Sequence, residues 1–166
     1  MLNALQAYRH ARATGLQALG CDTSNRDPFA EFSEHLVAGL LDAELAASRV
    51  QKGYDVTTPD GDRVQVRYLA NPGGRWVSEH LVDFRADCDR YALVVFEAFD
   101  PRSVVVFNHS TLPDVCAALG ERHPNQDVVL QLTQRNYRQL LADHREFARL
   151  GVVVTDLTSL GGAADD

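Results

Sequence analysis

The chain has 166 residues, 45% of them hydrophobic, and a formal net charge of −7. A chain of this length and composition can bury one core and is too short for two, so we expect a single domain over residues 1–160. A small acidic tail at 161–166 is expected to be disordered. Lys52 is the only lysine and the arginines cluster no further than pairs, which argues against nonspecific coating of nucleic acid.

Two further function classes are disfavoured by the apolar pattern. No apolar run approaches the roughly 20 residues that a membrane-spanning helix needs. The N-terminal segment lacks the uninterrupted apolar stretch and the cleavage site of a secretory signal. We therefore expect a cytoplasmic protein with no membrane partner.

Two helices are predicted at the start of the chain. Apolar residues recur at close to helical spacing from Leu2 to Leu19. Asp27-Pro28 then offers a capping side chain followed by proline at the first helical position, so a second helix should run from Pro28 to about Ser48 and pack on a sheet. Glu44 lies at the edge of its apolar stripe, where a carboxylate either reaches water or needs a partner or metal ion.

A β-hairpin is the clearest local prediction. Tyr54–Thr58 and Arg63–Leu69 have the composition of strands, and Pro59-Asp60-Gly61-Asp62 between them is a strong turn signal. Because side chains alternate along a strand, Gln65 and Arg67 share one face of the second strand.

The remaining elements complete an alternation of strands and helices. Central strands are predicted at Tyr91–Phe99 and Ser103–Phe107, joined by a turn at Asp100-Pro101-Arg102. The later elements are a helix capped by Ser110 or Thr111 and ending at Leu119, a strand at Asp127–Leu132, and a helix capped by Thr133. This order predicts an α/β domain with a central mixed β-sheet and flanking helices.

The hairpin carries a motif. Gly53-Tyr54-Asp55 is followed, after nine residues, by Gln65-Val66-Arg67. Together with the preceding helix, this arrangement resembles the PD-(D/E)xK superfamily of restriction-endonuclease-like nucleases, over roughly Pro28 to Phe107. It is most similar to small bacterial members in which a Gly-x-Asp strand leads through an Asp-Gly turn into a Gln-x-Lys strand.

The resemblance implies that the protein acts on DNA through a bound metal ion. Asp55 would be the main ligand of Mg²⁺ or Mn²⁺, Gln65 a neutral oxygen ligand, and Glu44 the additional carboxylate that a preceding helix often supplies. Arg67 occupies the position of the lysine that positions and activates the attacking water. Mg²⁺ retains several waters, so two or three protein oxygens suffice to hold it.

Two departures from the motif affect activity. Gln65 removes one negative charge from the site. Arg67 keeps the positive charge but cannot be deprotonated, and its planar fork differs from a compact ammonium, although it can bind a phosphate bidentately. Lys52 is the nearest candidate for a replacement ammonium.

The cysteines and histidines show no recognisable site pattern. Cys21, Cys88 and Cys116 are odd in number and widely spaced, with no CxxC pair and no histidine at zinc-ligand spacing, so a structural zinc site is not expected. We expect the cysteines to be small buried hydrophobes. The six histidines are scattered and are expected at the surface.

Three functions are compatible with the sequence. The first is a metal-dependent DNA endonuclease of restriction or repair type. The second is a nuclease-fold module without cleavage that binds nucleic acid or protein, for example in a bacterial defence system or as a homodimer. The third is a small interaction domain in which the hairpin is only scaffold and Gln65 and Arg67 are ordinary solvent-facing residues. Acidic charge favours the last two, whereas convergence of Glu44, Asp55 and Arg67 would favour the first two.

Overall fold

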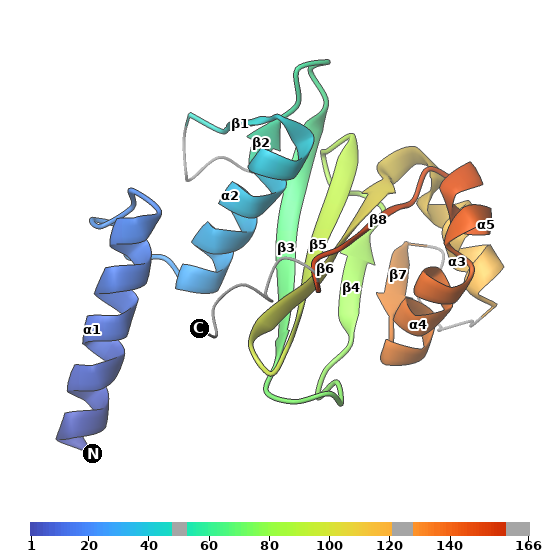
Figure 1. Ribbon diagram of the computed structural model, residues 1–166. Coiled ribbons are helices and arrows are strands. Elements are labelled where there is room, and N and C mark those ends of the chain that lie inside the picture. The colour runs from blue at the N-terminus through green and yellow to red at the C-terminus, as the bar shows by residue number, and fades with distance from the viewer. Residues whose placement is uncertain (48–52, 121–127, 159–166) are drawn as a thin grey trace.

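A six-stranded mixed sheet forms the centre of the computed structural model, which describes residues 1–47, 53–120 and 128–158 (Figure 1). The strands lie in the order β1-β2-β3-β5-β6-β8. Their bounds are β1 Glu44–Leu45, β2 Val56–Thr57, β3 Arg63–Asn71, β5 Arg90–Glu97, β6 Asp100–Asn108 and β8 Val153–Asp156. Among the described strands of this sheet, β3 and β5 are the only parallel neighbours, and the other pairs are antiparallel. The prediction of an α/β domain with a central mixed sheet is confirmed, while the predicted tail at 161–166 lies outside the described residues.

Helices cover both faces of the sheet (Figure 1). On one face α2 (Pro28–Leu41) packs on a core that includes Val64, Val66 and Phe96. On the other, a larger core lies beneath α3 (Leu112–Leu119), α4 (Gln134–Ala142), α5 (His144–Arg149) and a small sheet of β4 (His80–Asp83) and β7 (Val129–Leu132). A short 3₁₀ turn, His109–Thr111, precedes α3. Nearly every residue of β5 is buried, as expected for a central strand covered on both faces.

The two predicted hairpins are present, with one correction. β2 and β3 pair antiparallel as expected, although β2 is shorter than predicted. The β5–β6 turn lies at Ala98 and Phe99, not at the predicted Asp100-Pro101-Arg102. Both turn residues have positive φ, 52° and 65°, which a two-residue hairpin of type I′ requires. Alanine and phenylalanine rarely adopt this conformation, so the Asp-Pro pair is the stronger turn signal in the sequence.

The end of α2 is a second correction. The helix begins at Pro28 with Asp27 as its cap, as predicted, but it ends at Leu41 and does not reach Ser48. Asp42 takes a left-handed conformation, with φ 51°, and the Ala43 N–H bonds back to a carbonyl of the last turn. The chain then reverses into β1, so Glu44 is a strand residue.

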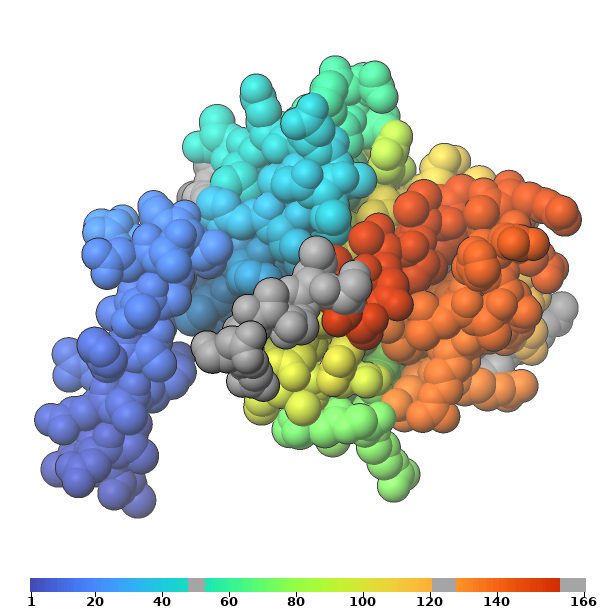
Figure 2. All heavy atoms as spheres, viewed as in Figure 1, coloured from blue at the N-terminus to red at the C-terminus, as the bar shows by residue number. Residues whose placement is uncertain are grey.

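The first helix, α1 (Leu2–Ala18), projects from the body of the protein (Figures 1 and 2). Leu16 is its one buried residue, while Leu2, Leu5 and Tyr8 are exposed. Its C-terminal half is held partly by Arg12, whose guanidinium donates to backbone carbonyls in the α1–α2 connection. None of the helices in the described part of the chain is both long and apolar enough to cross a membrane.

Candidate functional site

Asp55 lies where β2 and β3 separate. Its backbone N–H donates to the Val64 carbonyl at 2.9 Å, and its carboxylate Oδ2 accepts the Val66 N–H at 2.7 Å. The side chain therefore occupies the place where the next ladder partner of β3 would lie. This bond satisfies a strand N–H and fixes the carboxylate at the edge of the sheet.

Steric constraints explain why the first position of the motif, Gly53, is a glycine. Gly53 has a φ of 104°, which favours glycine. A Cβ at this position would lie 2.9 Å from the Asp87 carbonyl oxygen, closer than real Cβ atoms approach. The Gly-x-Asp pattern thus allows the chain to pass the loop before β5 and bring Asp55 into place.

Arg67 reaches the same carboxylate from β3. Its Nη1 lies 3.3 Å from Asp55 Oδ2 and 2.7 Å from the Val66 carbonyl oxygen, with 48% of the side chain exposed. Gln65 and Arg67 share the face opposite α2, because Val64 and Val66 point into the α2 core. Within the described residues, no hydrogen bond joins the Gln65 side chain to Asp55. The structure therefore brings Asp55 and Arg67 into contact and leaves Gln65 beside them on the strand.

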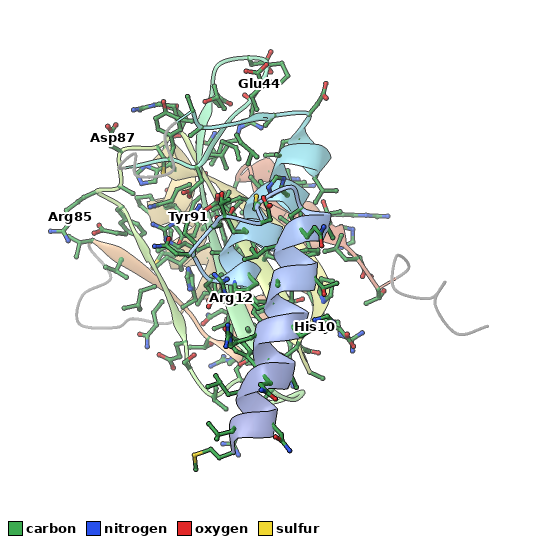
Figure 3. The ribbon with its side chains drawn as sticks, turned by 90° about the vertical axis from the view of Figure 1, so that its left-hand side faces the viewer. His10, Arg12, Glu44, Arg85, Asp87 and Tyr91 are labelled. Atoms are coloured by element: carbon green, nitrogen blue, oxygen red, sulfur yellow. The ribbon has the colours of Figure 1, made fainter. Side chains whose placement is uncertain are left out.

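The structure does not bring Glu44 to this cluster. Its side chain is exposed on the edge strand β1, opposite Thr57, because α2 ends before it. Figure 3 shows Glu44 at the outer end of the molecule. The prediction that Glu44 is a helix carboxylate is therefore wrong, because Glu44 is a strand residue, while its role as a metal ligand stays a prediction. Lys52, the candidate ammonium, lies outside the described residues.

Glu34 is the helix carboxylate whose charge acts on Asp55. It lies on α2, is only 3% exposed, and forms a bidentate ion pair with Arg26. Glu31, one turn earlier, is 1% exposed and lies 3.6 Å from Arg26. The hydrogen bond with Glu34 is the main reason why the pKa of Arg26 is raised. The signal for Glu34 was in the sequence: it precedes the buried Val37 by three positions and so shares the inward face.

The charged form of Asp55 is disfavoured by its surroundings. Burial raises the pKa of the Asp55 carboxyl, and the negative charge of Glu34 raises it further. The Val66 N–H and the charges of Arg67 and Arg26 act in the opposite direction but do not cancel the rise. A bound cation would stabilise the charged form of such a carboxylate, because it would offset both the loss of hydration and the negative charge of Glu34.

A histidine–tyrosine pair borders the cluster and was missed by the sequence analysis. His80 Nε2 lies 2.6 Å from the hydroxyl of Tyr91, which is the register partner of Gln65 on β5. Burial, aided by the charge of Arg67, lowers the pKa of His80 to about 4, and burial raises the pKa of Tyr91. The expectation that the histidines lie at the surface is wrong for His80. No sequence signal pointed to the pair, because it depends on the pairing of β4 with β7.

No protein-family model matches the sequence, and no curated protein matches it either. The motif residues and the geometry of the cluster are therefore the basis on which function is inferred.

Proposed function

We propose that the chain acts on DNA through the cluster of Glu34, Asp55 and Arg67, as a metal-dependent phosphodiesterase of weakened activity. The observation that carries the proposal is the contact of the Asp55 carboxylate with the half-exposed guanidinium of Arg67, together with the charge of the buried Glu34 carboxylate that acts on Asp55. Two carboxylates beside an exposed cation form a site that can bind a metal ion and a phosphate together.

The donor set fits Mg²⁺ or Mn²⁺. These ions prefer oxygen ligands, and Glu34 and Asp55 supply carboxylates from two elements, with the Gln65 amide as a third candidate ligand. The raised pKa of Asp55 supports the fit, because a divalent ion would relieve the repulsion from Glu34. When bound, the ion would supply polarisation of the phosphoryl group and activation of water. The protein would hold the carboxylates in place and bind the phosphate through Arg67.

Three features of the site support weakened activity. Gln65 contributes no negative charge, and Arg67 cannot give up a proton. Arg26 already forms a bidentate ion pair with Glu34, so a metal ion has to compete with a guanidinium for that carboxylate.

The second candidate is a non-catalytic module of the same fold that binds nucleic acid or protein. It is favoured by the pairing of both carboxylates with arginine, Glu34 with Arg26 and Asp55 with Arg67. Such pairing compensates the buried charges without a metal ion. The half-exposed Arg67 would then serve only in binding.

Plasmid nicking with Mg²⁺ or Mn²⁺, with EDTA as the blank, tests the proposal. We expect feeble cleavage by the wild type, more by Arg67→Lys alone or with Gln65→Glu, and none by Asp55→Ala. Glu44→Ala tests the ligand that the sequence predicted and should cut like the wild type, because this exposed carboxylate makes no hydrogen bond or ion pair with Asp55 or Arg67 within the described residues.

Two outcomes would overturn the proposal. If wild-type cleavage is strong and drops in Arg67→Lys, arginine is a working catalytic group and activity is not weakened. If none of the variants cuts, while fluorescence anisotropy shows DNA binding that Arg67→Ala weakens, the non-catalytic module is the correct function.

A further inference from the structure

A second cluster of potential metal ligands lies at the junction of α1 and α2. One ligand atom each from Cys21, Glu31 and His35 can be chosen so that all three lie within 4.8 Å of one another. Cys21 lies three residues after the end of α1, while Glu31 and His35 are four positions apart on α2 and so lie on one side of that helix. The fold thus assembles donors whose separation along the sequence gave no zinc signal.

The distances suit a tetrahedral ion. Cys21 Sγ lies 3.3 Å from His35 Nε2. With Zn–S near about 2.3 Å and Zn–N near about 2.0 Å, tetrahedral angles place sulfur and nitrogen roughly 3.5 Å apart. The two side chains therefore need little rearrangement to become ligands of one ion.

The surroundings of Glu31 resemble those of a metal-binding carboxylate. Its side chain is 1% exposed, so its orientation is set by the protein. The Ser24 hydroxyl donates to Oε1 at 2.7 Å, and Arg26 lies 3.6 Å from the same oxygen. Hydrogen bonds of this kind orient carboxylate ligands in metal sites.

We propose that Cys21, Glu31 and His35 form a binding site for one Zn²⁺ ion that fastens α1 to α2. Thiolate and imidazole ligands select a borderline-soft ion over Mg²⁺ or Mn²⁺. The site is therefore chemically distinct from the cluster at Asp55. Since Leu16 is the one buried residue of α1, an ion held by Cys21 adds a strong link where the helix has little packing.

Titration of the reduced, metal-free 166-residue chain with Co²⁺ tests the site. We expect one ion per chain, a thiolate-to-cobalt charge-transfer band, the d–d bands of a tetrahedral centre, and loss of all bands on addition of Zn²⁺. Cys21→Ser should abolish the charge-transfer band, and His35→Gln should weaken binding by at least about a hundredfold, since even outer partners of metal ligands contribute about 10- to 100-fold. Ser24→Ala should weaken binding by about tenfold.

The controls separate this site from other thiols and from the Asp55 cluster. Cys116→Ala and His144→Gln should bind Co²⁺ like the wild type, and Asp55→Ala should retain the full spectrum. Zn²⁺ should also raise the Tm of the wild type but not that of Cys21→Ser, as expected for an ion that binds only the folded state. Absence of a charge-transfer band in the wild type, or an equal band in Cys21→Ser, would overturn the proposal.

Discussion

Arg26 is the residue whose removal should affect the candidate site most directly. It forms a bidentate ion pair with Glu34 and lies close to Glu31, and both carboxylates are almost fully buried. Breaking a buried ion pair costs about 3–5 kcal/mol. Because the Arg26 side chain is itself 29% exposed, we expect Arg26→Met, which keeps most of the aliphatic volume, to lose roughly 2–4 kcal/mol of stability. At about 2–4 °C per kcal/mol for a chain of this size, Tm should fall by roughly 4–16 °C.

The same substitution measures competition between arginine and metal. If Arg26 compensates the charge that a divalent ion would otherwise compensate, Mg²⁺ should stabilise Arg26→Met more than the wild type. An ion at a hundred times its Kd adds about 2.7 kcal/mol, which is enough to restore most of the loss. Thermal and urea unfolding with and without Mg²⁺ provide the measurement, with Arg85→Met as a control that alters only an exposed ion pair with Asp83. An unchanged Tm would show that Arg26 does not compensate the buried carboxylates, and equal stabilisation of variant and wild type by Mg²⁺ would show that Arg26 does not compete with a metal ion.

Two predictions concern pH. The pKa of Asp55 is raised by folding, so its charged form costs stability above the folded pKa and costs nothing below the unfolded pKa near 4. Asp55→Asn keeps an acceptor for the Val66 N–H, so it should be more stable than the wild type in urea at pH 7. The difference in stability should vanish below about pH 4. A lower stability of the variant at pH 7 would mean that the favourable charges of Arg67 and Arg26 outweigh the cost of burial. The pKa of His80 is lowered to about 4, so its contribution to stability is complete above the unfolded pKa of about 6.5 and is lost as pH falls towards 4. The His80 imidazole should titrate near pH 4 by NMR. His80→Gln should flatten the pH dependence of urea unfolding between pH 4 and about 6.5. An NMR titration midpoint near about pH 6.5 would contradict the effect of burial on His80.

The elements that depend on local patterning could be predicted from the sequence, and those that depend on unusual backbone conformations could not. Alternation along β3 and the Asp-Gly turn were sufficient for the hairpin, because strand register follows from which face is buried. The end of α2 was missed because an aspartate, Asp42, takes the left-handed conformation that a glycine would have signalled. A helix extended to Ser48 places Glu44 on its inward edge, whereas in the structure the buried helix carboxylate is Glu34.

The carboxylate of Glu34 shows why charge on the inward face of a helix is informative. A buried ion pair is often no more stabilising than an apolar pair of similar volume, because both charges lose their hydration. The paired charges on the inward side of α2 therefore stabilise the fold no more than apolar side chains would; they belong to Glu31, Glu34 and Arg26. Asp55 adds a further charged group, whose pKa is raised. Under the proposed function, these charges are retained because the binding of a cation and a phosphate requires them.

Arg26 also connects the two candidate sites, because it contacts both Glu34 and Glu31. A cation held by Glu31 at the α1–α2 junction would repel the guanidinium, and a cation held by Glu34 beside Asp55 would displace it towards Glu31. Either ion therefore changes the affinity of the other site through one side chain, and by thermodynamic linkage the two effects on binding free energy are equal. If the proposed Zn²⁺ site exists, the junction of α1 and α2 would be more than an attachment point for a projecting helix, since its occupancy would set how strongly Arg26 competes for the Glu34 carboxylate.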